Sequence, residues 1–325
     1  MPAPPEPKDV SIVIPVKNES ASIDAFAAGL AEQTATAGEV IFVDGGSTDD
    51  TRDRLRAITK AHAGWRLLSA GQATPGRGRN VGARSACLPW IAFTDAGTRA
   101  DRAWLASLVA ATRRDPDAAV VWGNFHPVTD TFFTRCAALA YATRLTPRPG
   151  GPSRGPATVS MLIRRDVWEA VGGFPDLRAG EDLIFFQKIQ AHGARAVWAP
   201  DAAVHWRMQP TFADTFLRLR EYSRANVQGG LERRWHYGVL RQYTVLALFA
   251  LLAGLHDWRW ALAIPAAFAL RTAKSIWVRA NERRLASLIN PAVFLTVLAI
   301  LVTTDMATFA GWAQGIADKI RARRG

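Results

Sequence analysis

The chain has 325 residues, enough to bury a full hydrophobic core and to leave room for a second region. Lysine and arginine total 40 against 28 aspartates and glutamates, which gives a net charge of +12 and a pI near 10.6. Such a basic chain is expected to bind an anion, and nucleic acid, acidic lipid and nucleotide phosphates all qualify. The two cysteines, Cys87 and Cys136, stand far apart in apolar surroundings, which excludes a metal cluster or a disulfide framework and predicts two buried packing residues.

The first part of the chain alternates strand and helix patterns. Residues 1–9 contain no apolar run and are expected to form an N-terminal tail rather than a signal peptide. Apolar runs predict three strands, over residues 10–16, 40–43 and 65–69. Helical periodicity follows the first two of them. Asp44 ends the second strand in the sequence D-G-G-S-T-D-D-T, whose glycines and acids suit a tight turn that grips a ribose or a base.

A glycine-rich stretch follows the third strand. Residues 75–83 read P-G-R-G-R-N-V-G-A, which predicts a turn that opens a helix. The two arginines of this stretch, together with the N–H groups at the helix start, could bind a diphosphate.

The next predicted strand ends at a single carboxylate. Trp90–Phe93 is a continuous apolar run, typical of a parallel strand covered on both faces, and Asp95 and a glycine follow it closely. Ligands bind at the carboxyl edge of such sheets, so Asp95 could hold a metal or a substrate hydroxyl. The alternative is an aspartate that caps a helix or a turn.

The following segment continues the alternation. Helices are predicted over residues 104–113 and 131–145, and strands over residues 118–123 and 159–163. Residues 148–156 form a proline- and glycine-rich loop of the mobile, substrate-covering kind. Glu181 and Asp182 then open a helix, where an acidic pair can either serve chemistry or compensate the helix dipole.

Six short motifs occur in order over residues 10–206. They read I-V-I-P-V-K-N-E, V-D-G-G-S-T-D-D-T, G-R-N-V-G-A, F-T-D-A-G-T, V-G-G-F and G-E-D. In this order they resemble an inverting family 2 glycosyltransferase of the GT-A fold. The resemblance implies an α/β catalytic domain with a doubly wound, mostly parallel sheet, which takes sugar from a nucleotide-diphospho-sugar donor.

The same resemblance implies roles for individual residues. It implies a nucleotide pocket lined by Pro15, Asn18, Glu19 and Asp44. Arg79 and Asn80 would approach the nucleotide and its phosphates, and Asp95 would hold the ribose or a divalent metal, Mg²⁺ or Mn²⁺. Asp182 would be the catalytic base, while Glu181 would orient the turn or contact the acceptor.

The chain departs from the family pattern at two places. Gly45 stands where the family often has a second acid after the second strand. The D-x-D motif is also incomplete, because Ala96 and Gly97 follow Asp95. One carboxylate then remains for a metal ion, which normally takes one or two carboxylates together with phosphates and water. The nearby arginines are expected to share the phosphate charge.

Residues 207–238 are rich in arginine and are expected to form basic amphipathic helices next to a membrane. Arg220 and Arg224 lie four residues apart on one predicted helix face, where they could clamp the leaving diphosphate or contact anionic lipid. A solvated basic face is the alternative. Leu231 occupies the glutamine position of the Q-x-x-R-W motif that similar processive synthases carry, which favours a non-processive enzyme.

Residues 239–325 are dominated by apolar runs. They predict a membrane hairpin over about 239–272 and a further apolar helix over about 287–316. The hairpin is flanked by basic residues, Arg233, Arg234 and Arg241 before it and Arg271, Lys274, Arg279, Arg283 and Arg284 after it. By the positive-inside rule the catalytic domain and the basic tail face the cytosol at the cytoplasmic membrane, so the last apolar helix is expected to be re-entrant or interfacial.

Together these features predict a membrane-anchored transferase. It would move a single sugar, with inversion, from a nucleotide sugar to a lipid-linked or membrane-proximal glycan acceptor, in polysaccharide or glycolipid synthesis. Membrane lipids are the other expected partner, and nucleic acid is not expected. One alternative is a polyprenyl-phosphate sugar synthase, whose phosphate acceptor needs little help from a base. Another is a catalytically degenerate membrane scaffold of the same fold, motivated by Gly45 and the incomplete D-x-D motif.

Overall fold

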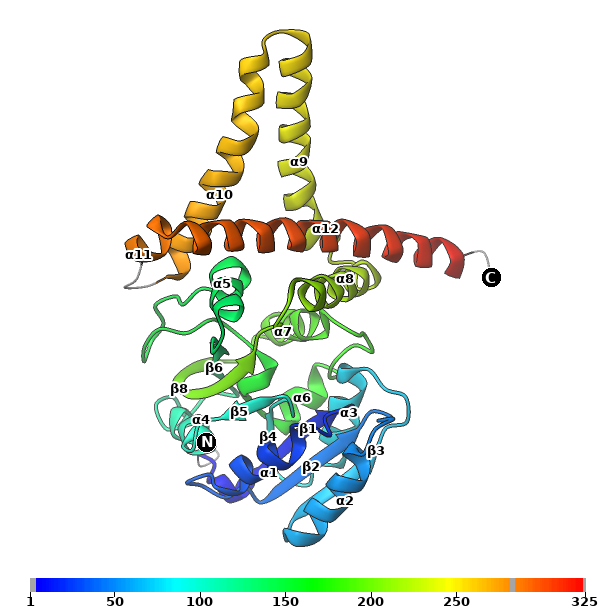
Figure 1. Cartoon of the computed structure of the whole chain (residues 1–325). Coiled ribbons are helices and arrows are strands. Elements are labelled where there is room, and N and C mark those ends of the chain that lie inside the picture. The colour runs from blue at the N-terminus through cyan, green and yellow to red at the C-terminus, as the bar shows by residue number, and fades with distance from the viewer. Residues whose placement is uncertain (1–3, 281–283, 324–325) are drawn as a thin grey trace. The chain divides into compact units, whose positions relative to one another are not determined.

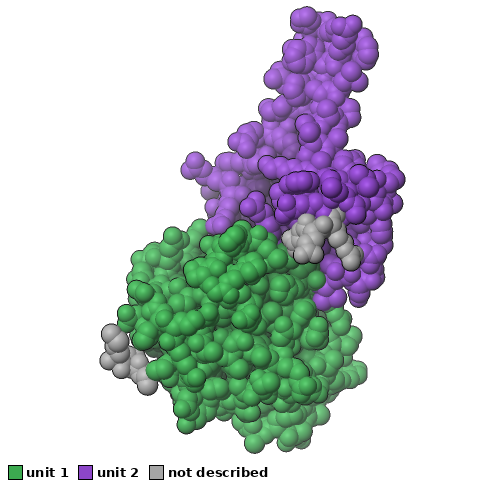
Figure 2. Space-filling view, turned by 90° about the vertical axis from the view of Figure 1, so that its left-hand side faces the viewer, with its two compact units in different colours: residues 1–127, 145–207 green, residues 128–144, 208–325 purple. Residues whose placement is uncertain are grey.

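The computed structural model describes residues 4–280 and 284–323. The chain divides into two compact units, which Figure 2 shows in different colours. The first unit comprises residues 1–127 and 145–207, and the second comprises residues 128–144 and 208–325. Residues 128–144 lie inside the range predicted for the catalytic domain, so the second unit takes one segment from within that range.

In the described residues, eight strands form one mixed sheet (Figure 1). They are β1 (Val10–Val16), β2 (Glu39–Asp44), β3 (Trp65–Ser69), β4 (Trp90–Phe93), β5 (Thr98–Ala100), β6 (Val120–Val128), β7 (Met161–Arg164) and β8 (Ala196–Arg207). Their order is β3-β2-β1-β4-β7-β6-β8-β5. The pairs among β3, β2, β1 and β4 are parallel, whereas β7 is antiparallel to β4 and β6, and β5 is antiparallel to β8.

The strand order creates a switch point between β1 and β4. From β1 the chain moves to β2 and β3 on one side and then returns to β4 on the other side of β1. In open α/β sheets, ligands bind in the crevice outside the carboxyl ends of the strands at such a point. The loops after β1 and β4 carry Glu19 and Asp95, so both carboxylates leave the sheet at its ligand-binding edge.

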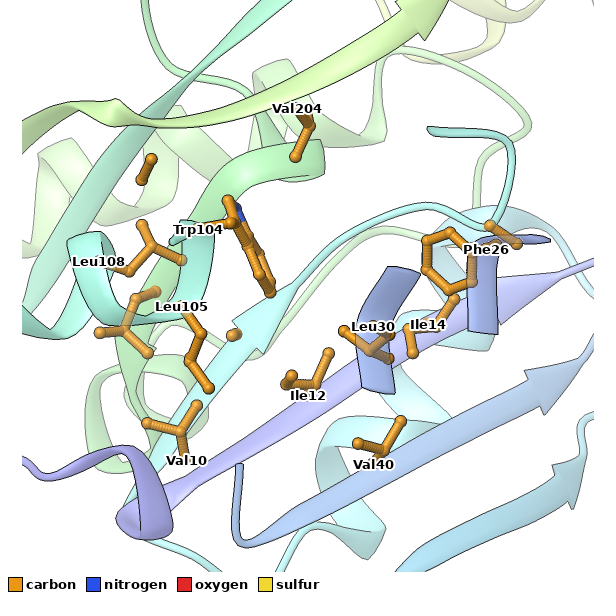
Figure 3. Close-up of a cluster of buried hydrophobic side chains, with 14 of the residues drawn as sticks. Val10, Ile12, Ile14, Phe26, Leu30, Val40, Trp104, Leu105, Leu108 and Val204 are labelled. Carbon is orange, nitrogen blue, oxygen red and sulfur yellow. The ribbon is translucent and has the colours of Figure 1, made fainter. Parts of the chain in front are cut away.

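Alternate residues of the strands face two separate hydrophobic cores. On β1, Ile12 and Ile14 face the first core and Val13 faces the second. Figure 3 shows the first core, where Phe26 and Trp104 approach the sheet. The first core is covered by α1 (Ile23–Ala31), α2 (Thr51–Ala61) and α4 (Trp104–Thr112), and the second by α3 (Pro75–Ser85), α6 (Arg165–Ala170) and α7 (Glu181–His192). Burial on both faces explains why these strands are apolar at consecutive positions.

Three expectations from the sequence are wrong in detail. The glycine-rich stretch is not a turn, because α3 already begins at Pro75, and the Thr74 side chain caps it by accepting the N–H of Arg77. The short edge strand β5 and the long strand β8 had no predicted counterpart, since β5 spans three residues and β8 contains a proline. Cys87 is exposed, whereas Cys136 is buried as expected.

The glycines of α3 allow the helix to lie close to the sheet. An added Cβ at Gly82 would come within 2.4 Å of Cγ1 of Val13, and one at Gly78 within 3.3 Å of Cβ of Pro15. Only glycine at position 82 therefore permits the observed approach of α3 to β1. The glycine spacing of α3 thus allows close packing against β1.

The second unit is helical. Its helices are α5 (Phe132–Tyr141), α8 (Phe212–Gln228), α9 (Glu232–Leu255), α10 (Ala263–Arg279), which the short helix η3 (Trp258–Leu262) precedes, α11 (Arg284–Ile289) and α12 (Pro291–Ala322). Three helical segments are long and apolar enough to cross a membrane: α9, η3 with α10, and α12. Within this unit α9 and α10 form a hairpin, and α12 runs across its base (Figure 1). Arg283, one of the predicted flanking basic residues, lies outside the described residues.

Close contacts bind α12 to its neighbours in the second unit. An added Cβ at Gly311 would lie 2.2 Å from the carbonyl oxygen of Arg220 on α8, so these two backbones touch. Asp305 of α12 is buried and accepts hydrogen bonds from both Nη atoms of Arg271 on α10, one of them at 2.8 Å. The hydroxyl of Tyr243 on α9 donates to Asp305 at 3.1 Å. Glycine contacts thus join α12 to α8, and a polar cluster joins α12 to α9 and α10.

Candidate active site

A buried arginine links two carboxylates at the ligand-binding edge of the sheet. Nη2 of Arg79, on α3, donates to Oδ1 of Asp95 at 2.7 Å, and Nη1 donates to Oε1 of Glu181 at 2.8 Å. Arg79 is only 4% exposed. Three residues that lie far apart in the sequence, from α3, the loop after β4 and the first turn of α7, thus form one charged network.

The loop before α7 holds this arginine in place. The guanidinium of Arg79 lies over the ring of Phe174, 5.5 Å from the ring centroid. The side chain of Asn80 donates to the carbonyl of Phe174 at 2.7 Å and accepts its N–H at 2.9 Å. Gly173 has φ of 63°, and an added Cβ there would be 2.5 Å from Oδ1 of Asn80. Asn80 therefore fastens the V-G-G-F loop to α3 through both polar atoms of its side chain.

Asp182 stands beside this network in the first turn of α7. Its Oδ1 accepts the N–H of Leu183 at 2.7 Å. Burial, followed by the nearby charge of Asp95, raises the pKa of Asp182 above the usual range of an aspartate. Burial also raises the pKa of Glu181, although the charge of Arg79 opposes the rise. Arg79 thus donates hydrogen bonds to two of the three carboxylates, Asp95 and Glu181, and the described residues show no such bond from Arg79 to Asp182.

The loops after β1 and β2 are joined to each other beside the crevice. Oδ1 of Asn18 accepts the N–H of Thr48 at 2.8 Å, and the N–H of Asn18 donates to Oγ of Ser47 at 3.0 Å. Asp44 is buried and accepts the N–H of Ser47 at 3.0 Å. Asn18 has φ of 56°, a left-handed conformation that asparagine tolerates. Pro15, Asn18 and Asp44 lie at the strand ends where the nucleotide pocket was expected, and the side chains of Asn18 and Asp44 accept hydrogen bonds from the loop after β2.

A second carboxylate lies beside the incomplete D-x-D motif. Oε1 of Glu19 is 3.3 Å from the position that a Cβ would take on Gly97. Glu19 therefore brings a carboxylate, from the loop after β1, to the place of the missing second acid. Its Oε2 accepts the Ser22 hydroxyl at 2.5 Å. Among the described residues there is no group of three or more acidic, histidine or cysteine side chains suited to a metal ion, so any ion here needs oxygens from the substrate.

Comparison with known proteins identifies the family. The family model "Glycosyl transferase family 2" matches residues 11–172, which include Arg79 and Asp95 and end before Glu181. The chain belongs to glycosyl transferase family 2. The glycine-rich helix, the Asp95 turn and the V-G-G-F loop all fall on this family match or at its end.

Two curated relatives of this family 2 chain are glycosyltransferases by name. A validoxylamine A glucosyltransferase of Streptomyces hygroscopicus subsp. jinggangensis is 36% identical over 125 residues, which are 35% of this chain and 28% of the relative. Glycosyltransferase AglE of Haloferax volcanii is 28% identical over 200 residues, 59% of this chain and 64% of the relative. The chain thus spans less than two thirds of the length of either relative.

Two solved structures share the GT-A fold of this family 2 chain. The mannosyltransferase PcManGT from Pyrobaculum calidifontis, in complex with GDP-Man and Mn²⁺, has a TM-score of 0.56 and 21% identity over 94% of this chain and 89% of its own. S. aureus TarS 1-349 in complex with UDP has a TM-score of 0.50 and 16% identity over 94% of this chain and 91% of its own. At these identities the likeness concerns the fold alone.

Two of the expected binding residues belong to the other unit of the family 2 chain. Arg220 and Arg224 lie on α8 in the second unit. Nε of Arg224 donates to Asp318 of α12 at 2.5 Å, and Arg220 donates to its neighbour Glu221 at 3.2 Å. Both arginines therefore have carboxylate partners within that unit. Conversely, sequence reasoning gave no role to Phe174, although its motif V-G-G-F was recognised, because its contact with Arg79 depends on the folded loop.

Proposed function

We propose that the protein transfers a sugar from a nucleoside-diphosphate donor to an acceptor hydroxyl with inversion, using Asp182 as general base. The single observation that carries this proposal is the position of Asp182, whose pKa is raised by burial, beside the Arg79 network at the switch point of the sheet. The family membership supports the reaction class. GDP-Man in PcManGT and UDP in TarS support a nucleoside-diphosphate sugar as donor.

In the proposed reaction, the acceptor oxygen forms a bond to the anomeric carbon while the bond from that carbon to the diphosphate oxygen breaks. The hydroxyl proton passes to the carboxylate of Asp182, and the nucleoside diphosphate leaves with the bonding electron pair. Attack opposite the leaving group inverts the anomeric configuration. Arg79 binds Asp95 and Glu181 and holds both side chains in place, and Asn80 fastens the loop before α7 through its contacts with Phe174.

Asp95 and Glu19 are the residues that would hold a divalent metal. The fit is acceptable because Oδ1 of Asp95 is used by Arg79 while Oδ2 has no hydrogen-bond partner among the described residues, and because Glu19 lies at the Gly97 position. Two carboxylates, completed by diphosphate and water, match what Mg²⁺ or Mn²⁺ takes. When bound, the ion would neutralise charge on the leaving diphosphate.

The apolar hairpin of the second unit supports attachment to a membrane. The helices α9 and η3–α10 have mean hydropathies of 1.6 and 1.2 over their most apolar windows, and very few residues of these windows are buried. Basic residues at both outer ends of the hairpin favour a cytosolic catalytic domain at the cytoplasmic membrane, which agrees with a lipid-linked or membrane-proximal acceptor. Because α12 crosses the base of the hairpin, we take it to lie in the interface and not to span (Figure 1).

The test uses the purified full-length chain in detergent with a panel of UDP-, GDP- and dTDP-sugars. Donor hydrolysis or transfer above background with at least one donor is expected, and no turnover with any donor would support the scaffold alternative. Excess chelator should remove most of the activity, and restored metal should recover it. Full turnover in chelator would leave Asp95 as a ribose contact and contradict the metal role.

A further inference from the structure

The base of the apolar hairpin carries two arginines that the proposed transfer reaction does not use. Arg279 is the last residue of α10, and Arg144 lies shortly after the end of α5. Both belong to the second unit, in which α10 contacts α5, α11 and α12 (Figure 1). The charge of Arg144 acts on Arg279, so the two guanidinium groups are close enough to repel each other.

Hydrogen bonds fix the guanidinium of Arg279 in one orientation. Its Nε donates to the carbonyl of Ala142 at 2.7 Å, and its Nη1 donates to the hydroxyl of Ser275 at 2.9 Å. The same hydroxyl donates to the carbonyls of Leu139 and Ala140 at 2.9 and 3.1 Å. Arg279 and Ser275 of α10 therefore cap the C-terminal end of α5.

Capping leaves one edge of this guanidinium available. The partners of Arg279 are uncharged, and its Nη2 has no hydrogen-bond partner among the described residues. Solvent reaches Nη2, so two N–H groups of a half-buried cation remain free to donate. The side chain of Arg144 is exposed. Within residues 4–280 and 284–323, no carboxylate forms an ion pair with either arginine.

An arginine two turns earlier on α10 is neutralised within the protein. Arg271 donates to both carboxylate oxygens of Asp305. Arg279 instead faces a second cation, which is unfavourable because like charges repel and because burial removes water from the guanidinium. An anion bound between Arg279 and Arg144 would offset this repulsion and accept charge-assisted hydrogen bonds from both side chains.

Apolar side chains beside the two arginines indicate the class of the anion. Trp277 of α10 is 46% exposed, and the guanidinium of Arg284, which begins α11, lies 5.3 Å from the centroid of its ring. An exposed tryptophan paired with an arginine is typical of the level of the lipid headgroups. Leu285 and Ile289 of α11 are also exposed. Apolar surface suited to acyl chains thus lies on the helix next to the free cations.

We propose that Arg144 and Arg279 bind the phosphate group of an anionic membrane lipid. This inference rests on the proposed attachment to a membrane and gives it a defined headgroup site. A lipid with a net negative headgroup, such as phosphatidylglycerol, matches two cations without acidic partners. A zwitterionic lipid would bring its own positive charge to the site and is disfavoured. The bound lipid would connect α5 to the membrane hairpin.

The first test measures lipid retention by native mass spectrometry of the full-length chain. The chain is released from a neutral detergent that contains equal amounts of phosphatidylglycerol and phosphatidylcholine. We expect one phosphatidylglycerol to be retained on the order of 10-fold more strongly than phosphatidylcholine, because its headgroup leaves the phosphate charge uncompensated. Equal retention of the two lipids would overturn the proposal.

Substitution of Arg144 tests the site with little risk to the fold, since this side chain is exposed. Arg144→Gln should weaken retention of phosphatidylglycerol on the order of 10-fold, because a charge-assisted hydrogen bond is lost. Arg259→Gln is the matched control, since Arg259 is exposed in η3 at the other end of the 17-residue helix α10. It corrects for the general attraction of anionic lipid to a chain of net charge +12. Equal losses in the two variants would contradict a defined site.

Substitution of Arg279 tests the fixed member of the pair. Arg279→Gln should weaken retention of phosphatidylglycerol, and Arg279→Lys should recover part of it because the charge is kept. Thermal unfolding in detergent checks the fold of each variant, since α5 loses a capping group. If a variant fails to fold, the comparison of Arg144→Gln with Arg259→Gln decides the question. Parent-like retention in a folded Arg279→Gln variant would overturn the proposal.

Inorganic phosphate distinguishes a lipid from a soluble anion at this site. A large excess of phosphate should displace little of the lipid, because the free ion lacks the apolar contacts that acyl chains make. Complete displacement would indicate a soluble anion and overturn the lipid assignment. Flotation with phosphatidylcholine vesicles reports membrane attachment, and donor hydrolysis in detergent reports turnover. Failure of the lipid site is therefore distinguishable from failure of the proposed function.

Discussion

Two arginine networks, one in each unit, differ in their charge balance. Arg79 is shared by Asp95 and Glu181, and Asp182 adds a third carboxylate beside them. In the second unit, the guanidinium of Arg271 binds one carboxylate, Asp305, with both Nη atoms, and a neutral tyrosine hydroxyl completes the group. The first network has an excess of negative charge, whereas the second is neutral.

This difference in charge balance distinguishes a candidate active site, the Arg79 network, from a structural contact, the Arg271 network. Unmatched carboxylates destabilise the folded state at neutral pH, and such a cost is expected where a proton acceptor or a cation-binding group is needed. A neutral bidentate pair has no charge left for a ligand and serves to join helices. The two networks therefore predict opposite responses to the same kinds of substitution.

The largest expected effect concerns Asp182. Asp182→Asn keeps the shape of the side chain but removes the proton acceptor, so the transfer rate should fall on the order of 10²- to 10⁴-fold while donor binding is retained. Steady-state transfer and donor binding by calorimetry measure the two quantities. Asp53→Asn, an exposed aspartate on α2, is the matched control. A retained rate would favour the polyprenyl-phosphate alternative, while lost donor binding with a normal maximal rate would make Asp182 a donor-site residue.

Removing Arg79 should destabilise the protein next most strongly. Arg79→Met leaves two carboxylates without their buried partner, which typically costs about 3–5 kcal/mol in free energy of unfolding. The loss should be smaller in acid, because protonation removes the uncompensated charge. Denaturant unfolding at pH 7 and pH 5 measures both effects. An equal loss at the two pH values would contradict the charge argument.

Removing Arg271 should have a smaller effect, and one that a second substitution reverses. Its side chain is 27% exposed, so Arg271→Met should cost roughly 1–3 kcal/mol by leaving Asp305 unpaired. Arg271→Met combined with Asp305→Leu should be close to the parent, since a neutral pair is replaceable by apolar packing. Thermal unfolding in detergent compares the three proteins. If the double variant were less stable than Arg271→Met alone, the ion pair would contribute a stability that apolar packing cannot replace, which would contradict this prediction.

The smallest effect is a gain in stability at neutral pH. The pKa of Asp182 is raised in the folded state, so its contribution to stability is fully present below the unfolded pKa and is lost as pH rises through the folded value. Asp182→Asn removes an ionised, buried group and should therefore unfold at a higher temperature than the parent at pH 7. The gain should vanish in acid. A lower melting temperature for this variant at pH 7 would mean that the carboxylate is stabilised by its surroundings.

Local patterns were sufficient to predict the core of the first unit. The strands β1 and β4 are buried on both faces, which explains their continuous apolar runs. Helix α1 is buried on one face, which explains the helical spacing of Ile23, Phe26 and Leu30. The position of Asp95 after β4 was predicted for the same reason. Conversely, β8 was missed, because a proline and polar residues break its apolar pattern.

The contacts that define the candidate site were beyond sequence reasoning. Arg79 and Glu181 are 102 positions apart, and their pairing depends on how the first turn of α7 meets the start of α3. Glu19 reaches Gly97 only because β1 and β4 are neighbours, which follows from strand order and not from spacing along the chain.

The close contact between α8 and α12 has a consequence for biosynthesis and for making a soluble protein. The ribosome releases α8 before the hairpin, and the segment around Gly311 that covers it emerges only after the hairpin is complete. A chain that stops before α9 would leave the face of α8 at Arg220 and Val227 permanently open. A shortened variant should instead lack α9 and α10 and have α8 joined to α12 through a flexible linker, so that Gly311 and Gly315 still contact α8.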